Sequence, residues 1–565
     1  MLPYRLPCVS IALVPNARLS PGSLSAYIAA ALLVGTPLHA VSHTALIVPA
    51  PNAISVGNCD DAGPGSLRDA IALAGSGDVI DLTRLTCSTI SLSTGELSIP
   101  QSSLTLLGPG SAALAVDGGG TQRVIDHGGV GTLQVQGMTI RNGYVHAAAA
   151  DGGCIHTEGS TLVLSDTVVT SCKIVATPCT PSRGGAVFAP SDAIIIDSTI
   201  SDSDAEVTAC PMNYAALGGG LYVFSNLNLI GSTISGNKVT GSSNNSGGGV
   251  WLRYGGTFQD SHISANYAPA GGGVFSAGAT HFVRSTLDSN IAYANGGGVF
   301  AFAATTFDAS VLTGNSIMDA SGHGGGAFVT GGTLLARDTH FTGNSAFLGA
   351  ALYSQNDATL ERSTVAYNTR GTSIYAGGSS GSGTTTISNS TIAGNNKGGA
   401  MFASAAVVFR GPGVIANSTI AFNAFDSAGV VAVGPTLDLR STIMAANTGM
   451  FGPNDLIVAG GAISGDHDLI VASTSPTPPG TLTSCPKLDR LGMNGGITPT
   501  IALLQGSVGI DAGSNALMLA TDQRGAGFAR EFGGGADIGA FERHGEVDDA
   551  LFSSAFEAYC DSHKR

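Results

Sequence analysis

The sequence predicts an all-β protein whose main domain is a right-handed parallel β-helix, a solenoid of stacked coils of about two dozen residues. One short phrase returns every 24 to 29 residues, and a glycine-rich phrase is interleaved with it. The composition points the same way, because 81 of 565 residues are glycine and only 11% are charged. Few charges, many glycines and short Val, Ile and Leu runs favour strands joined by tight turns.

The first phrase is Ser-Thr-Ile-x-x-Asn, with close variants. Side chains alternate faces along a strand, so the Ile and Ser of this phrase point inward and its Thr points outward. Coils that stack at the spacing of paired strands bring equivalent residues over one another. Stacked Asn side chains can bond one another and tolerate left-handed backbone angles. We therefore predict a structural ladder formed by Asn237, Asn266, Asn290, Asn315, Asn344, Asn368, Asn395 and Asn423.

The second phrase is a glycine cluster followed by apolar residues. It reads GGAVF at 184–188, GGGVF at 271–275 and 296–300, and GGAMF at 398–402. Each coil is therefore predicted to hold a Gly turn, a strand, a connector, a second strand with Ser-Thr-Ile, and an Asn turn. A β-propeller repeat of about 40–45 residues is too long for this period, and the frame of a leucine-rich repeat is absent.

The N-terminal segment, residues 1–40, has the pattern of an export signal. Arg5 and Arg18 form a basic leader, and the apolar run at 26–34 is followed by small residues. A membrane anchor is the rival interpretation, but the run is well short of the ~20 apolar residues that span a bilayer. No later segment is apolar enough to span a membrane as a helix. We therefore expect signal cleavage and a secreted protein.

Eight of the nine cysteines follow this leader. An even number of cysteines in an exported chain fits disulfides. Local pairs are Cys59 with Cys87 and Cys172 with Cys179, although sequence alone does not fix the connectivity. The irregular spacings and the lack of a CxxC motif do not favour zinc.

Three segments resemble known families. Residues 184–423 resemble the repeats of the polymorphic outer-membrane-protein family, whose signature is Gly-Gly-Ala-Ile with Phe-x-x-Asn. Residues 58–71 (NCDDAGPGSLRDAI) resemble the CSLREA-type N-terminal region of bacterial secreted β-helix proteins, and this resemblance implies a capping helix over 66–73. Residues 488–542 resemble the choice-of-anchor Q domain at LGMNGG, IDAG, TDQRG and DIGAFE. These resemblances imply a β-helix on the surface of a Gram-negative bacterium.

Together these patterns divide the chain into five predicted parts. They are a signal peptide (1–40), an N-terminal cap with the first coils (54–130), parallel β-helix repeats (131–470), a choice-of-anchor Q-like module (485–542) and a C-terminal tail (543–565).

Asp166 and Asp197 form a candidate acidic pair on successive coils, three places before the inward apolar residue of the repeat. Close carboxylates raise one pKa or recruit a cation, so this is where calcium would bind. The alternative is a pair splayed into water. We predict no required cofactor and no metal centre. Asp338 and Arg362 occupy the same column and are predicted to form a surface ion pair of little energetic value.

Trp251, Arg253 and Tyr254 are candidate sugar-stacking residues, with Phe258 on the same coil. An aromatic ring beside an Arg can stack on a sugar ring. The alternative is packing beneath a loop.

The net charge of −15 disfavours nucleic acid as a partner. Charged residues of the terminal module are predicted to fix loops rather than catalyse, namely Asp511, Asp522, Arg524, Asp537 and Glu542. The sequence holds no nucleophile motif, phosphate loop or metal-ligand spacing. We predict a monomeric, non-catalytic adhesion or glycan-contact protein whose partner is a polysaccharide or cell-surface glycan. The alternative is a polysaccharide lyase or glycoside hydrolase acting on the outer face of the β-helix.

Overall fold

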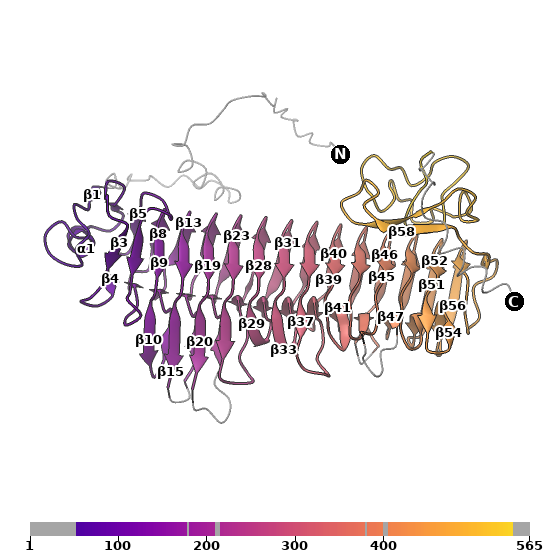
Figure 1. Cartoon of the computed structure of the whole chain (residues 1–565), viewed down its shortest axis with the longest axis horizontal. Helices are drawn as coiled ribbons and strands as arrows, with labels where there is room; N and C mark the ends of the chain where they lie inside the picture. The colour runs from indigo at the N-terminus through magenta and orange to yellow at the C-terminus, as the bar shows by residue number, and fades with distance from the viewer. Residues whose placement is uncertain (1–51, 178–179, 209–214, 379–380, 399–404, 546–565) are drawn as a thin grey trace, which may run out of the picture. The chain divides into compact units, whose positions relative to one another are not determined.

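The computed structural model describes residues 52–545, except 178–179, 209–214, 379–380 and 399–404 (Figure 1). The predicted signal peptide (1–40) lies outside the described residues, as does most of the predicted tail. The described chain is a parallel β-solenoid with one short α-helix, which confirms the predicted fold class. None of its described residues belongs to a helix long and apolar enough to cross a bilayer.

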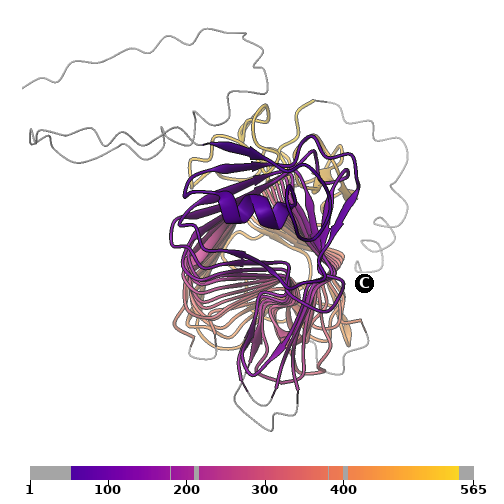
Figure 2. The ribbon, with the colours of Figure 1, turned by 90° about the vertical axis from the view of Figure 1, so that its left-hand side faces the viewer.

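Each coil crosses three parallel sheets, which we name C, A and B in chain order. A representative coil runs through β22 (Leu221–Val223) of sheet C, β23 (Asn226–Ile230) of sheet A and β24 (Thr233–Ser235) of sheet B. It then adds β25 (Lys238–Thr240) to a side sheet before it enters β26 (Val250–Leu252) of sheet C. The view along the solenoid axis shows three-sided coils with the side sheet extending from one corner (Figure 2).

The strand of sheet A lies in the segment that the sequence pattern assigned to a connector. In β23, Leu227 and Leu229 are buried, whereas Asn226 and Asn228 are exposed. This is the alternation of a half-buried strand. A coil therefore has three strands rather than two, because a third side is needed to enclose the apolar residues of the other two.

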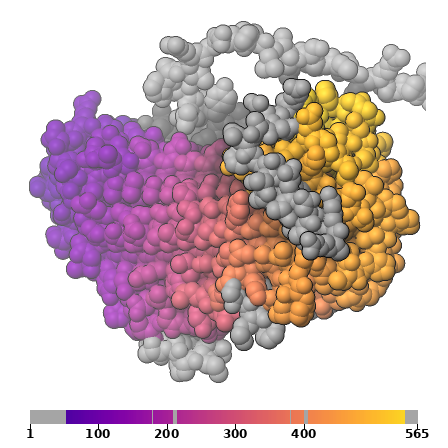
Figure 3. Space-filling view, turned by 45° about the vertical axis from the view of Figure 1, so that its right-hand side comes forward, coloured from indigo at the N-terminus to yellow at the C-terminus, as the bar shows by residue number. Residues whose placement is uncertain are grey.

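The three sheets run the length of the solenoid with little change of register. Sheet A has 16 strands, from β1 (Ala53–Ser55) to β56 (Ala462–Asp466), and sheet C has 14, from β4 (Leu97–Ile99) to β55 (Leu456–Val458). The surface colour changes steadily along the coils, as expected when each coil touches mainly its neighbours (Figure 3). The 15 strands of sheet B are β3 (Thr89–Ser91), β6 (Ala115–Asp117), β9 (Thr139–Arg141), β14 (Val168–Thr170), β19 (Thr199–Ser201), β24, β28 (His262–Ser264), β32 (Thr286–Asp288), β36 (Val311–Thr313), β40 (His340–Thr342), β43 (Thr364–Ala366), β46 (Thr391–Ala393), β49 (Thr419–Ala421), β52 (Ile443–Ala445) and β57 (Leu469–Ile470).

A short helix, α1 (Leu67–Leu73), caps the N-terminal end of the solenoid, as the sequence predicted (Figure 2). The Ser66 hydroxyl accepts a hydrogen bond from the backbone N–H of Asp69 at 3.2 Å, which is the usual N-cap arrangement. Leu67, Ala70 and Ile71 are buried against the first coils. The helix thereby covers apolar side chains that no earlier coil could cover.

The eight repeat asparagines form one buried, hydrogen-bonded column. The backbone N–H and the Nδ2 of Asn290 both donate to Oδ1 of Asn315, at 3.1 and 3.0 Å. Asn315 donates in the same way to Asn344 on the next coil. Each member also donates from Nδ2 to a main-chain carbonyl of the preceding coil, such as Leu287 O for Asn315. The column therefore satisfies both the side-chain amides and the backbone groups at the bend.

Two disulfides lie near the N-terminal end of the solenoid. One joins Cys59 to Cys87, in agreement with the sequence-based pairing. The other joins Cys172 to Cys154, so the predicted pairing of Cys172 with Cys179 is wrong, and Cys179 lies outside the described residues. The Cα atoms of Cys154 and Cys172 are 5.5 Å apart, a normal disulfide distance, because the two residues lie at the start and near the end of one coil.

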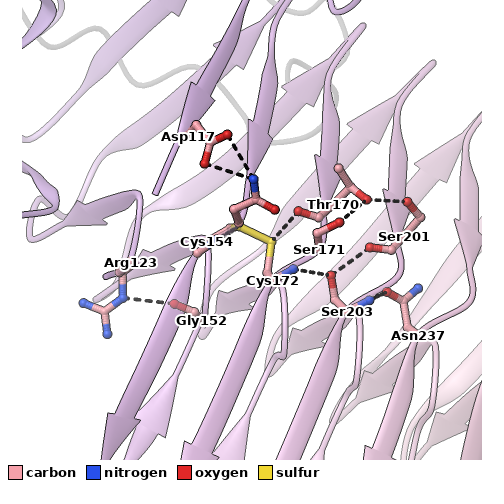
Figure 4. The surroundings of a disulfide bond; sticks show 12 residues. Asp117, Arg123, Gly152, Cys154, Thr170, Ser171, Cys172, Ser201, Ser203 and Asn237 are labelled. Atoms are coloured by element: carbon pink, nitrogen blue, oxygen red, sulfur yellow. Dashed lines mark hydrogen bonds between the residues drawn. A yellow bond between two sulfur atoms is a disulfide. The ribbon is translucent and has the colours of Figure 1, made fainter. Parts of the chain in front are cut away.

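Cys172 of this disulfide occupies the position that an Asn of the asparagine column fills on later coils (Figure 4). The backbone N–H of Cys172 donates to the Ser203 hydroxyl at 3.2 Å. The N–H of Ser203 donates in turn to Oδ1 of Asn237 at 3.1 Å, where the asparagine column begins.

Replacing Cys154 and Cys172 together by alanine is expected to destabilise this end of the solenoid by about 3 kcal/mol, because the bond closes an 18-residue loop and limits the unfolded chain. Urea unfolding of the oxidised protein and the double variant would measure the difference. An unchanged midpoint would contradict the assigned bond.

The C-terminal module packs on the outer face of sheet B. It contains an antiparallel pair, β58 (Leu488–Gly492) and β59 (Thr500–Leu503). Nε2 of Gln523 donates to Oγ1 of Thr364 at 2.8 Å. The N–H of Ala540 donates to Oγ1 of Thr419 at 3.0 Å. These bonds to outward threonines show that the module covers the last coils of this sheet.

Candidate functional site

The predicted acidic pair lies at the turn between sheets A and B. Asp166 and Asp197 are on successive coils, and both have left-handed backbone angles, φ 46° and 47°. Asp166 accepts a hydrogen bond from Ser111 Oγ at 3.2 Å. The Asp197 carboxylate instead lies over Gly231 on the next coil. The two carboxylates thus share a column but have separate surroundings.

Further along the same turn, acidic and basic residues alternate. Arg284 makes two bonds of 2.7 Å to the Asp260 carboxylate. Arg362 makes two bonds of 2.9 Å to Asp338, the ion pair predicted from the sequence. Among the described residues, no group of three or more His, Cys, Asp or Glu side chains is arranged to hold a metal ion. This edge is therefore a row of turn residues and ion pairs.

Trp251 lies in a stack of aromatic rings on the outer side of sheet C. Its ring is parallel to that of Tyr222 at 4.6 Å and to that of Phe275 at 6.0 Å, and only 9% of the residue is exposed. Phe258, from the same coil, points into the core and stacks on Phe282. Both faces of Trp251 are thus occupied by rings, which leaves no face for a sugar.

Arg253 and Tyr254 are placed differently, at the exposed turn between sheets C and A. Tyr254 is 60% exposed and makes an edge-to-face contact with Phe224, which is 40% exposed. Phe302 lies at the same turn further along and is 47% exposed. Backbone bonds from Arg253 to Val223 and from Phe302 to Ser276 fix these residues at equivalent turns of the solenoid. We call Phe224, Arg253, Tyr254 and Phe302 the ring ridge.

Phe224 and Phe302 were not predicted from the sequence. Their signal is an aromatic residue directly after the strand of the glycine phrase, in GGGLYVF and GGGVFAF. Side chains alternate along each strand, so the middle residue, Tyr222 or Phe300, points to the outer face of sheet C. The next aromatic falls in the turn, where it faces solvent.

A charged cluster lies at the N-terminal end of the aromatic stack. Asp126 Oδ1 is 2.7 Å from Nδ1 of His156, and Nη1 of Arg123 contacts Asp126 at 3.2 Å and Glu96 at 2.9 Å. The hydrogen bond from His156 and the nearby Arg123 charge lower the pKa of Asp126. The His156 ring stacks on Phe188 at 5.2 Å. This cluster holds Asp126 ionised and orients His156. It was not predicted from the sequence, although Asp126 and His156 occupy equivalent positions on neighbouring coils.

Four of the five charged residues predicted to fix loops of the terminal module are buried, whereas Asp511 is exposed and accepts hydrogen bonds from the N–H groups of Gly534 and Gly535. Arg524 pairs with Asp522 at 2.6 Å, and the Arg524 guanidinium lies over the rings of Phe528 and Phe541. The Glu542 carboxylate accepts bonds from two backbone N–H groups, and burial raises the pKa of Glu542 to about 7. These groups bond loop backbones to one another, which is the arrangement expected of loop-fixing residues.

Comparison with known proteins agrees with this architecture. The family model described as a right-handed beta helix region matches residues 249–411. No curated protein matches the chain. A solved structure, "Crystal structure of pectate lyase Pel9A", is similar with 12% identity over 88% of this chain and 97% of that one, at a TM-score of 0.25. At this level the likeness has no bearing on activity. Residues 249–411 are thus a right-handed β-helix region, with the coil geometry seen in the rest of the described solenoid.

Proposed function

We propose that this protein is a secreted or cell-surface, non-catalytic protein that contacts glycans through the ring ridge. The observation that carries the proposal is the exposure of three aromatic rings at equivalent turns beside Arg253. Two features make exposed rings a good sugar platform: a large apolar face and a polar or charged neighbour. Tyr254 contacts Phe224 edge to face, and Phe302 lies against Phe275 and Phe300 of the outer stack, yet 40–60% of each exposed residue remains open to a ligand.

Polar side chains of sheet A lie next to the ring ridge. Asn228, Thr257 and His281 are outward residues of β23, β27 (Gly255–Gln259) and β31 (Ala279–Val283). A sugar stacked on Tyr254 would have hydroxyl groups within the same surface region as these hydrogen-bonding groups. Stacking would supply affinity, and the polar groups would supply orientation.

Export is part of the proposal. The disulfides Cys59–Cys87 and Cys154–Cys172 support an oxidising compartment. The expected signal peptide supports the same location, as do the resemblances of residues 58–71, 184–423 and 488–542 to bacterial surface proteins. We propose the outer surface of a Gram-negative bacterium.

Replacing Tyr254 and Phe302 together by alanine is expected to weaken glycan binding at least tenfold, because both exposed ring faces are lost. Binding would be measured on an array of neutral and uronate polysaccharides, followed by calorimetry with the strongest hit. Val130→Ala is the matched control, since Val130 is 75% exposed at the turn between the same two sheets and carries no ring.

Equal binding by the double variant and the control would exclude the ring ridge as the contact surface. Incubation with the same polysaccharides tests the non-catalytic part of the proposal. Release of unsaturated or reducing sugar products, lost in Asp197→Ala, would replace it with a lyase or hydrolase acting at the acidic pair.

A further inference from the structure

A second ladder of side chains runs parallel to the asparagine column, at the turn between sheets A and B. Its members are serine and threonine, and from Thr167 to Ser390 the backbone N–H of each member donates to the hydroxyl of the next coil, as Ser390 does to Ser418 at 3.2 Å. Each hydroxyl also donates to main-chain carbonyls. Thr442 Oγ1 donates to the Arg440 carbonyl and to the Ile415 carbonyl of the preceding coil, both at 3.2 Å. Every ladder position thus requires a side chain that both accepts and donates.

The ladder ends on a buried carboxyl group rather than a hydroxyl. The N–H of Thr442 donates to Oδ1 of Asp468 at 3.0 Å. Oδ2 of Asp468 is also buried and has no hydrogen-bond partner among the described residues. A carboxylate can accept hydrogen bonds but cannot donate one. An ionised Asp468 therefore accepts from Thr442 but lacks the donated bond of the other ladder members, and its Oδ2 is buried without a donor. A carboxylic acid, with a proton on Oδ2, both accepts and donates.

The surroundings of Asp468 also disfavour a negative charge. Asp466 precedes it on β56, and Asp438 lies on the neighbouring strand β51 (Thr436–Arg440). Arg440 is paired with Asp438, His467 lies 3.6 Å from Asp466, and no salt bridge reaches Asp468 from the described residues. Burial, followed by these two carboxylates, raises the pKa of Asp468 to about 7.

Asp468 also anchors the segment that closes the C-terminal end of the solenoid. The N–H of Leu482 donates to the Asp468 carbonyl at 2.8 Å, and the N–H of Ile470 donates to the Leu482 carbonyl at 2.9 Å. Leu469, the next residue, packs in one apolar cluster with Leu488 of the terminal module. A change at Asp468 therefore acts on the last strand, the closing segment and the module contact.

We propose that Asp468 is a proton-binding residue that closes the C-terminal end of the solenoid as a neutral acid and loosens this end when it ionises. The direction of the pH dependence follows from the difference between the pKa values of Asp468 in the folded and unfolded chain. Because the folded-state pKa lies above the unfolded value, the stabilisation is complete below about pH 4 and is lost as pH rises to about 7. The asparagine column continues from Asn423 to Asn447, which donates to Oδ1 of Asp455. Asp455 adds the same trend at lower pH, since burial raises its pKa to about 6.

Hydrogen exchange at pH 5 and pH 7.5 tests this proposal, with protection factors corrected for intrinsic exchange. The amides of Thr442, Ile470 and Leu482 report on the closed end, and Leu287 in the middle of the solenoid is the internal reference. Asp468→Asn keeps one acceptor and supplies donors without a charge. At pH 7.5 this variant is expected to protect the three amides at least tenfold more than the unchanged protein, and at pH 5 the ratio is expected to be clearly smaller, because only part of the stabilisation has been lost at that pH.

Equal or lower protection in Asp468→Asn at pH 7.5 would overturn the proposal. Asp468→Ser, which restores the residue type of the ladder, is a second variant with the same expected direction, in case the Asn variant does not fold. Asp466→Asn is the control for a general loss of charge, since Asp466 is exposed, and its effect is expected to stay below threefold. An effect of Asp466→Asn as large as that of Asp468→Asn would also contradict the assignment.

Discussion

Replacing Asn315 by alanine is expected to lower the local stability of the middle coils by about 3–5 kcal/mol. The Asn315 side chain accepts two hydrogen bonds from Asn290 and donates one each to Asn344 and to the Leu287 carbonyl. Alanine would leave the backbone N–H of Asn290 without an acceptor and would remove one of the two hydrogen bonds of its Nδ2 group, which keeps the Ile263 carbonyl. Removing one partner of a buried bond costs more than the bond itself contributes, because the remaining group has lost its water as well.

Hydrogen exchange of peptides around residue 315 would measure this effect, since long repeat structures open locally rather than in one step. Asn228→Ala is the matched control, because Asn228 is exposed on sheet A. Its expected effect is within about 0.5 kcal/mol. Similar losses in both variants would mean that the asparagine column has no special role.

Replacing Arg524 by alanine is expected to cost about 3–5 kcal/mol and to unfold the terminal module before the solenoid. The change leaves Asp522, which is fully buried, without its cation and removes the group that lies over Phe528 and Phe541. Limited proteolysis followed by mass spectrometry would show new cleavage in residues 488–542 while the coils stay intact. Arg284→Ala is the control, because it breaks an exposed ion pair with Asp260 and should change little. Protection of the module in Arg524→Ala would show that the buried pair does not hold it together.

The coil period could be predicted because every coil repeats the same physical requirement. A buried bend needs an amide that both accepts and donates, and only a few residue types can meet that need. Asn237 and its equivalents therefore appear at regular intervals in the sequence. The capping helix at residues 67–73 was also predicted, from the resemblance of residues 58–71 to the CSLREA-type N-terminal region.

Other features depend on contacts between distant residues. Cys172 is closer in sequence to Cys179, yet the coil brings it to Cys154, so sequence distance misled the pairing. The strand of sheet A varies in sequence because only two of its side chains need to be apolar, as in Leu227 and Leu229. It therefore resembled a connector.

The candidate site was found only in part. Arg253 and Tyr254 are exposed as a sugar-contact surface requires, because they follow the end of β26 at Leu252, whereas Trp251 lies within that strand and is stacked between rings of the neighbouring coils. Phe224 and Phe302 could not be grouped with Tyr254 until the turns were aligned in space. The closing role proposed for Asp468 needs the position of its free oxygen, which no sequence pattern contains.

The stacking of residues one coil apart supports every assignment made above, and cysteine cross-linking tests it directly. Thr257 and His281 are paired on neighbouring strands of sheet A, and Thr306 follows on the next. Paired strands are about 4.8 Å apart, within reach of a disulfide, whereas two coils span about 10 Å, which is too far. Thr257→Cys with His281→Cys should therefore oxidise to a bond seen by mass spectrometry, and Thr257→Cys with Thr306→Cys should not. The reverse result would contradict the stacked coils.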